Sequence, residues 1–188
     1  MDKIEDIFKS FPVLETERLR LVEIEQEYLT DLYTLFGDEE VTRFYNIKTF
    51  GKEEDGQIYL DWFRNRFKDK MGIRWGIELK ENPGIIGTIG FNNFTVHHKA
   101  NIGYDLQSAY WGKGYITEAL NKVLDFGFTN LLLNRIEAEV LIGNVASERV
   151  LSKLGFQREG ILREWMLWDG RYFDMIMYSL LKRDFKKS

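Results

Sequence analysis

The sequence predicts a mixed α/β fold in which helices cover a central sheet. Segments with the period of a strand and segments with the period of a helix follow one another along the chain, separated by turn residues. The chain has 188 residues, of which 44% are hydrophobic and 15% aromatic, and this suits one globular domain with a sizeable core. No repeat or low-complexity tract interrupts it, so we expect residues 1–188 to form a single domain.

The first half of the chain begins with a strand and two helices. Residues 18–24 (RLRLVEI) alternate leucine with arginine, as expected of a strand with one buried face. Residues 26–36 and 53–69 have the spacing of helices. Two strands follow in RWGIEL (74–79) and IIGTIGF (85–91), and the KENPG between them supplies turn chemistry for a hairpin through Asn-Pro-Gly.

The second half continues the alternation of strands and helices. Its final two strands are joined by Asp169-Gly170, a pair preferred in type I′ hairpin turns. Four elements come before them: a strand at 100–106 (ANIGYDL), a strongly amphipathic helix from Ile116 to Phe128, a strand at 135–141 (RIEAEVL), and a short helix in NVASERVLSKLGF that ends at Gly155.

The composition excludes several kinds of chemistry. Without cysteine there is no disulfide, thiolate nucleophile or cysteine-bound metal, and His97 and His98 point apart as neighbours, so we expect no metal site. The 26 basic and 30 acidic residues are scattered, whereas nucleic-acid binding needs a concentrated basic surface. No signal peptide or membrane-spanning run is visible, so we expect a cytoplasmic protein with neither nucleic acid nor membrane as partner.

The segment YWGKGYITEAL (110–120) places two glycines at the junction of a strand and a helix. Gly112 and Gly114 allow a ligand to approach the main chain, and the N–H groups at the start of a helix favour an anion. Lys113 can add positive charge. The segment lacks the third glycine of a dinucleotide fingerprint and the ending of a P-loop. A phosphate site and a plain tight turn explain it about equally well.

Two polar residues of NVASERVLSKLGF (144–156) have both a structural and a functional explanation. Ser147 shares a helix face with Val150, Leu151 and Leu154, so its hydroxyl lies on the face expected to be buried. A bond to a carbonyl one turn earlier is the simpler explanation. Asn144 is explained most simply as the helix N-cap, and its amide can also contact a ligand.

Glu164 is a candidate base. Period-two alternation in ILREWMLW (161–168) puts it on one face with Leu162, Met166 and Trp168. A carboxylate among large apolar groups holds a proton more readily than a solvated one, and so can accept one near neutral pH. The alternative is an edge strand with Glu164 in water or paired with an arginine.

Together these segments resemble the GNAT acyl-CoA N-acyltransferase superfamily, and within it the RimJ/RimL branch that acetylates the N-termini of ribosomal proteins. The resemblance runs from LETERLRLVEI (14–24) to GRYFDMIMYSLL (170–181). YWGKGYITEAL is similar to the superfamily's pyrophosphate loop, and NVASERVLSKLGF is similar to its second cofactor motif. The resemblance implies a mixed, mostly antiparallel sheet flanked by helices.

The resemblance also implies a site for acetyl-CoA as cosubstrate. The strand that ends at Asp105 and Leu106 would run beside the pantetheine arm, with the Leu106 N–H near the thioester oxygen. Asn144 would contact the same arm. The pyrophosphate would be held by the main-chain amides of Gly112, Lys113, Gly114, Tyr115 and Ile116.

Catalytic roles come from the same resemblance. In the RimL-like branch, a serine matching Ser147 is the proposed general acid and a glutamate matching Glu164 is the proposed base. Leu151 stands where many superfamily members have a tyrosine that serves as general acid, so the role of general acid is not assigned to Leu151. Trp111 and Ile116 also depart from the usual residues, but main-chain donors survive both changes.

We therefore expect direct transfer of an acetyl group to a primary amine, with the N-terminal α-amino group of a ribosomal protein as the leading acceptor. Its pKa near ~8 demands less of a base than a lysine near ~10.4. A polyamine or aminoglycoside is an alternative, for which GDEE (37–40) and KEED (52–55) supply acidity, although solvated helix starts explain both runs more simply. A non-catalytic CoA-sensing module is another. The aromatic REWMLW (163–168) fits a homodimer interface and core burial equally well.

Overall fold

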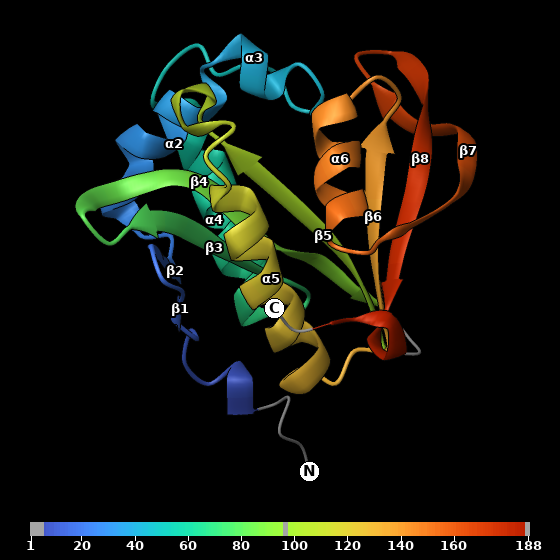
Figure 1. The fold of residues 1–188 in the computed structure, drawn as a ribbon. Coiled ribbons are helices and arrows are strands. Elements are labelled where there is room, and N and C mark those ends of the chain that lie inside the picture. Colours follow the sequence, from blue (N-terminus) through green and yellow to red (C-terminus); the bar gives the residue numbers. More distant parts are fainter. Residues whose placement is uncertain (1–5, 96–97, 187–188) are drawn as a thin grey trace.

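The computed structural model describes residues 6–95 and 98–186 and contains an eight-stranded mixed sheet with helices on both faces (Figure 1). The strand order is β1-β2-β3-β4-β5-β6-β8-β7, and β5 and β6 form the parallel pair among otherwise antiparallel neighbours. The strands are β1 (Leu14–Glu15), β2 (Leu19–Glu23), β3 (Ile73–Leu79), β4 (Asn82–Thr95), β5 (Lys99–Leu106), β6 (Arg135–Leu141), β7 (Gln157–Trp168) and β8 (Arg171–Leu181). The helices are α2 (Leu29–Phe36), α3 (Glu39–Thr42), α4 (Glu54–Lys68), α5 (Tyr115–Thr129) and α6 (Val145–Lys153).

The predicted fold class is confirmed, with differences at element ends. The helix expected from residue 26 starts as a 3₁₀ turn before α2, β1 was not predicted, and α3 begins in the run GDEE. Leu79 pairs with Asn82, so the β3–β4 turn lies at Lys80 and Glu81, and Pro83 falls inside the first residues of β4. This position suits proline, which cannot donate to a strand partner.

The final hairpin has the predicted turn. Asp169 and Gly170 both have positive φ, of 48° and 71°, as a type I′ turn requires. The β7–β8 pair therefore keeps the right-handed twist of the sheet, and it forms one end of the strand order.

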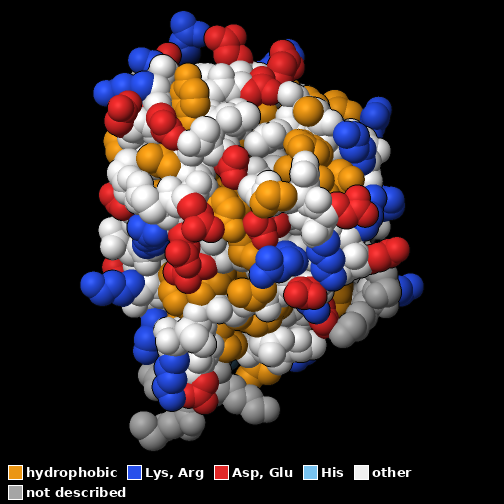
Figure 2. Space-filling model, turned by 90° about the vertical axis from the view of Figure 1, so that its left-hand side faces the viewer, with side chains coloured by type: hydrophobic (Ala, Val, Ile, Leu, Met, Phe, Trp, Pro, Cys, Tyr) orange, Lys and Arg blue, Asp and Glu red, His pale blue; other side chains and the backbone are white. Residues whose placement is uncertain are grey.

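Two apolar cores lie on opposite faces of the sheet. Leu19 and Leu21 of β2 pack in the core beneath α5 and α6, whereas Val22 and Ile24 pack in the core beneath α2 and α4. The central strands are thus buried on both faces, and most charged groups lie on the outer surface, with Arg74 and Asp105 as buried exceptions. On the face shown in Figure 2, acidic and basic side chains are interspersed, as on an ordinary solvated surface.

The sheet opens between β5 and β6. The parallel ladder has three pairs, which join Lys99, Ala100 and Asn101 to Arg135, Ile136 and Glu137. Beyond them both strands continue without pairing to each other, and Figure 1 shows them diverging toward their C-terminal ends. We call this opening the splay.

Charged side chains fasten the closed end of the splay. Arg135 of β6 donates to Glu137 at 2.6 Å and to both carboxylate oxygens of Glu159 in β7 at 2.7 and 2.5 Å. Ser179 of β8 donates to the same Glu159 at 2.6 Å. These bonds connect three strands beside the point where β5 and β6 separate. They also lower the pKa of Glu159 from 4.5 to about 2, with the Arg135 hydrogen bonds as the main cause.

This ion pair predicts an acid-sensitive contribution to stability. Because the folded-state pKa of Glu159 is depressed, its contribution is present above the unfolded pKa of 4.5 and is lost as pH falls toward 2. A Glu159→Gln variant should therefore have a lower free energy of unfolding than the parent protein at about pH 7. The difference between the two proteins should become smaller at about pH 3. Urea unfolding at both pH values measures this, with Glu81→Gln on the β3–β4 turn as the control. An equal deficit at both pH values would contradict the assignment.

Candidate active site

A cavity of about 630 Å³ occupies the splay. Its walls come from the C-terminal halves of β5 and β6, from the first turn of α5, from one face of α6, and from residues 40–45 in and after α3. Since β5 and β6 do not pair here, groups of both strands reach the cavity. Several predicted site residues line it together, namely Asp105, Leu106, Gly112, Gly114, Tyr115, Ile116, Asn144 and Ser147.

The cavity has two chemically different sides, because residues of a strand alternate between the faces of a sheet. Tyr104 of β5 faces α6, where it meets Ser147. The next residue, Asp105, faces the opposite way and meets Arg74, whose guanidinium lies over the Phe63 ring of α4 at 5.7 Å. We call these the α6 side and the α4 side of the splay.

The glycine segment forms the predicted junction with a helix. Gly112 and Gly114 have positive φ values of 75° and 83°, and Gly114 is the N-cap of α5 without a capping side chain. The first bond of the helix runs from the Glu118 N–H to the Gly114 carbonyl at 3.1 Å. The N–H groups of the first helical turn are therefore left for a ligand or solvent, which is the geometry of an anion site.

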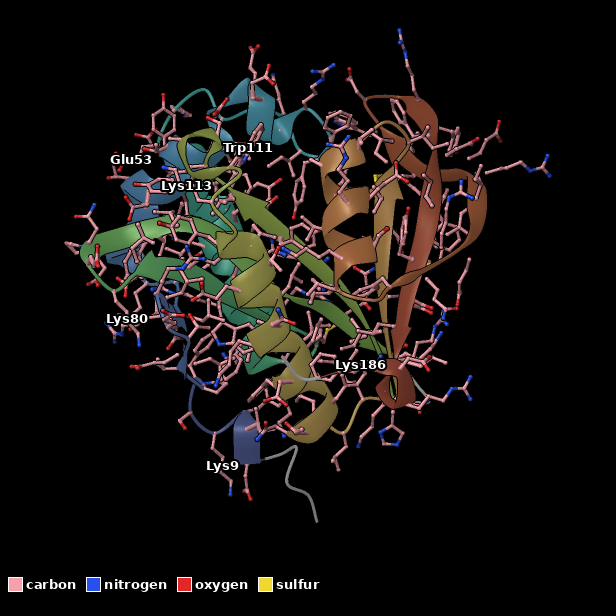
Figure 3. The ribbon with its side chains drawn as sticks, viewed as in Figure 1. Lys9, Glu53, Lys80, Trp111, Lys113 and Lys186 are labelled. Atoms are coloured by element: carbon pink, nitrogen blue, oxygen red, sulfur yellow. The ribbon has the colours of Figure 1, made fainter. Side chains whose placement is uncertain are left out.

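An arginine from outside the motif holds this loop. Arg18 donates to the Lys113 carbonyl at 3.1 Å and to Glu118 at 2.7 Å, and its guanidinium lies over the Tyr115 ring at 4.5 Å. The Lys113 ammonium itself lies 5.1 Å from the centre of the Tyr110 ring. Figure 3 shows Lys113 and Trp111 on the loop that leads into α5. No local pattern marks Arg18 as a site residue, because its partner Glu118 is 100 positions away along the chain.

The Leu106 main chain points into the splay. Gln107 donates to the Ile86 carbonyl at 2.9 Å, so Ile86 and Gln107 form a hydrogen-bonded pair of the β4–β5 ladder. Antiparallel pairs alternate, so the next pair, Gly87 and Leu106, is not hydrogen-bonded, and the Leu106 N–H points away from β4. The Leu106 carbonyl accepts from the Trp111 indole at 2.7 Å. The N–H thus faces the space that β6 has left.

Ser147 and Asn144 lie at the start of α6. The simpler explanation of Asn144 is confirmed, because it is the N-cap and its side chain accepts from the Ser147 N–H at 3.1 Å. The Ser147 hydroxyl, in contrast, lies 2.6 Å from the Tyr104 hydroxyl. Burial raises the pKa of Tyr104 to about 12, so it keeps its proton near neutral pH. Leu151 is fully buried in the core.

Asp105 is held by a buried ion pair. Its carboxylate pairs with Arg74 and accepts from Thr88 at 3.1 Å, and both Asp105 and Arg74 are buried. Arg74 also donates to Thr88 and to Asn92, each at 3.0 Å. Asp105 therefore lines the cavity with its side chain already occupied on the α4 side.

The prediction that Glu164 lies among apolar side chains is wrong. Leu162 pairs with Met175 and Met166 with Phe173, so three residues of β7 stand opposite Asp174 alone. In this bulge Glu164 is exposed, has a φ of 50°, and donates its N–H to Asp174 at 2.7 Å. It lies outside the residues that line the cavity. The alternation that placed Glu164 inward assumed an unbroken strand, and the bulge breaks it.

A different glutamate lines the cavity from β6. Glu139 accepts from Asn101 at 3.3 Å and from the Trp165 indole at 3.0 Å. Its only sequence signal is its place among the alternating polar residues of RIEAEVL, which is shared by most half-buried strands.

Among residues 6–95 and 98–186, no group of three or more His, Asp or Glu side chains has the arrangement to hold a metal ion. His97, half of the histidine pair, lies outside the described residues. None of the described helices is long and apolar enough to cross a membrane.

Comparison with known proteins agrees with this geometry. Residues 18–157 match the family described as Acetyltransferase (GNAT) domain. The chain is 39% identical over 173 residues to the uncharacterized N-acetyltransferase YoaA of Bacillus subtilis, covering 92% of this chain and 98% of that protein. It is 30% identical over 130 residues to the ribosomal protein uS5-alanine N-acetyltransferase of Escherichia coli, covering 68% and 67%. The crystal structure of the ribosomal-protein-S5-alanine acetyltransferase from Vibrio fischeri has a TM-score of 0.74 at 27% identity, covering 93% and 99%.

The buried ion pair predicts a large asymmetry between single and double substitution. Arg74→Met leaves the Asp105 carboxylate buried without its cation and should destabilise the fold by about 3–5 kcal/mol. Adding Asp105→Leu removes the stranded charge and should recover much of that loss. Urea unfolding measures both, with Arg149→Met on the exposed face of α6 as the control, expected within about 0.5 kcal/mol of the parent. A single variant as stable as the double would refute the pairing.

Proposed function

The chain belongs to the GNAT acetyltransferase family, and on that premise we propose that residues 1–188 act as one domain that transfers an acetyl group from acetyl-CoA to the N-terminal α-amino group of a protein. A ribosomal protein is the leading acceptor. The observation that carries the proposal is the splay, in which an unpaired main-chain N–H and a glycine-bounded helix start face one cavity.

The cavity residues fit acetyl-CoA. A pyrophosphate would accept hydrogen bonds from the main-chain amides of 112–116, where Gly112 has open space around it and Gly114 leaves the helix start uncapped. The pantetheine arm would lie between β5 and β6, within reach of the Asn144 amide. The thioester oxygen would then meet the Leu106 N–H. One well-placed donor of this kind typically stabilises a tetrahedral oxyanion by about 3 kcal/mol.

The reaction follows as a direct attack. The amine nitrogen bonds to the thioester carbon, the carbon–sulfur bond breaks, and the departing thiolate takes a proton. The chain has no cysteine to form a thioester with the acyl group first. Ser147, hydrogen-bonded to Tyr104, is the proposed donor to the thiolate. Glu164 as a base acting through a water stays a prediction, and its exposed position outside the residues that line the cavity does not favour it.

Two observations favour a peptide N-terminus over a polycation as acceptor. The relatives in Escherichia coli and Vibrio fischeri are named for alanine acetylation on a ribosomal protein. The acidic runs GDEE and KEED serve as helix starts, because Asp38 accepts from the Glu40 N–H at 2.9 Å and Asp55 from the Gly51 N–H at 2.8 Å. Asp38 and Asp55 therefore have partners within their own helix starts, which favours a structural role for the two runs over binding of a polyamine.

An acceptor panel tests the proposal. Thiol release from acetyl-CoA is measured with Ala- and Ser-starting peptides, spermidine and an aminoglycoside offered separately, and the cysteine-free protein adds no thiol background. We expect release with a peptide whose N-terminus is free and none when the same peptide carries an N-terminal acetyl group. Binding of acetyl-CoA without thiol release for any acceptor would favour a CoA-sensing module. Thiol release with spermidine alone would show that the acceptor is a polyamine and not a peptide.

Removal of the Ser147 hydroxyl should lower the rate of acetyl transfer moderately. A thiol has a pKa near ~8.5, so its thiolate leaves readily, and Ser147→Ala should lower kcat by at most about a hundredfold. The Kd for acetyl-CoA should stay within about twofold, since the Asn144 cap does not use the hydroxyl. Ser152→Ala on the exposed face of α6 is the matched control. An unchanged kcat in Ser147→Ala would remove the residue from the mechanism.

A further inference from the structure

We propose that Glu139 is the carboxylate that receives the acceptor amine, and that Trp165 is a positioning residue that holds it. This inference rests on the proposed acetyl transfer to an amine. Glu139 lies on β6, lines the cavity and is half-buried. Its hydrogen bonds connect it to the α4 side of the splay, opposite the hydroxyl pair of Tyr104 and Ser147.

A one-way series of hydrogen bonds fixes the role of Glu139 as an acceptor. Arg74 can only donate, and it donates to the Asn92 carbonyl oxygen at 3.0 Å. The Asn92 amide nitrogen then donates to the Asn101 oxygen at 3.0 Å, and the Asn101 nitrogen donates to Glu139 at 3.3 Å. Because the buried guanidinium sets the direction, neither amide can turn over without losing its partner.

The second donor to Glu139 also acts in one direction. The Trp165 indole N–H, which has no acceptor atom, donates to the other carboxylate oxygen at 3.0 Å. Each oxygen of Glu139 therefore meets one neutral donor and retains a lone pair for a ligand. This is the arrangement of an ionised carboxylate with room for an ammonium group.

The carboxylates next to Glu139 form ion pairs with arginine or lysine. Glu137, two residues earlier on β6, pairs with Arg135 at 2.6 Å and Lys99 at 3.6 Å. Asp105 pairs with Arg74. Within the described residues, Glu139 has no ion pair of this kind, so its charge is left for a cation that enters the cavity. An α-ammonium group supplies that cation.

The bulge in β7 explains how Trp165 reaches Glu139. β8 lies between β7 and β6 in the sheet, so a side chain of β7 must extend across β8. The three residues between Leu162 and Met166 project from the ladder, and Glu164 at their centre has left-handed φ. Bulges beside functional sites commonly redirect a side chain in this way. Trp165 is 55% exposed, so it holds the Glu139 carboxylate from the solvent side rather than from the core.

The proton balance assigns Glu139 a definite step. The acceptor ammonium gives one proton to the Glu139 carboxylate, and the free amine attacks the thioester carbon. The second proton, lost from nitrogen as the amide forms, passes to solvent, while the thiolate takes a proton from Ser147, which regains one from solvent. Glu139 then returns its proton to solvent. Donor and acceptor of protons thus stand on opposite sides of the sheet.

Glu139→Gln tests the carboxylate. With an Ala-starting peptide, kcat/KM should fall by roughly 10²–10³-fold, while the Kd for acetyl-CoA stays within about twofold. The peptide should also bind more weakly to the CoA-loaded protein, which is a readout independent of turnover. Glu81→Gln is the control for the charge change, and urea midpoints check folding. Retained activity in Glu139→Gln, or a loss confined to Glu164→Gln, would overturn the inference.

Trp165→Phe tests the positioning role, because it keeps an aromatic ring and removes the N–H. Loss of a donor to the carboxylate favours its protonated form, so the acidic limb of the kcat/KM pH profile should move to higher pH. The KM for the peptide should rise more than kcat falls. An unmoved acidic limb would exclude Trp165. If the parent protein itself releases no thiol with any acceptor, the proposed acetyl transfer fails. If the parent is active and the variants behave like it, only the roles of Glu139 and Trp165 fail.

Discussion

The short ladder between β5 and β6 is the constraint on which the site depends. Main-chain groups inside a protein need partners, and strands normally supply them to each other. After three pairs these two strands separate, and the inward groups of β5 must be satisfied otherwise. The Trp111 indole N–H donates to the Leu106 carbonyl, and the Leu106 N–H faces the cavity. The Arg135 and Glu159 bonds keep the other end closed. The opening is thus a stable part of the sheet.

Strand alternation then divides the chemistry between two faces. Tyr104 and Ser147 place hydroxyl groups on the α6 side, where the glycine segment also opens. The buried Arg74 organises the α4 side, since it pairs with Asp105 and directs the amides that end at Glu139. A thioester held between the strands would have proton donors on one side and a carboxylate on the other. The two kinds of group therefore reach one cavity from opposite faces of the sheet.

Sequence reasoning succeeded where the signal is local. The period of α5, the glycines before it and the Asn144 cap are all determined within a few residues, and the structure has each of them. Glu164 was misplaced because a bulge depends on the partner strand, here on Asp174, and alternation cannot reveal it. The Glu139 contact with Trp165 spans 26 positions, so no local pattern contains it. Local patterns therefore marked the glycine segment, Asn144 and Ser147, the family resemblance joined them with Leu106 in one site, and neither revealed Glu139.

A crystal structure of the protein with bound acetyl-CoA would test the central claim most directly. The distance to measure joins the Leu106 amide nitrogen to the thioester oxygen. The account predicts a separation of about 3 Å, with the pantetheine arm between β5 and β6 and the pyrophosphate on the amides that precede and begin α5. An acyl group bound outside the splay, with the Leu106 N–H bonded to solvent, would contradict it.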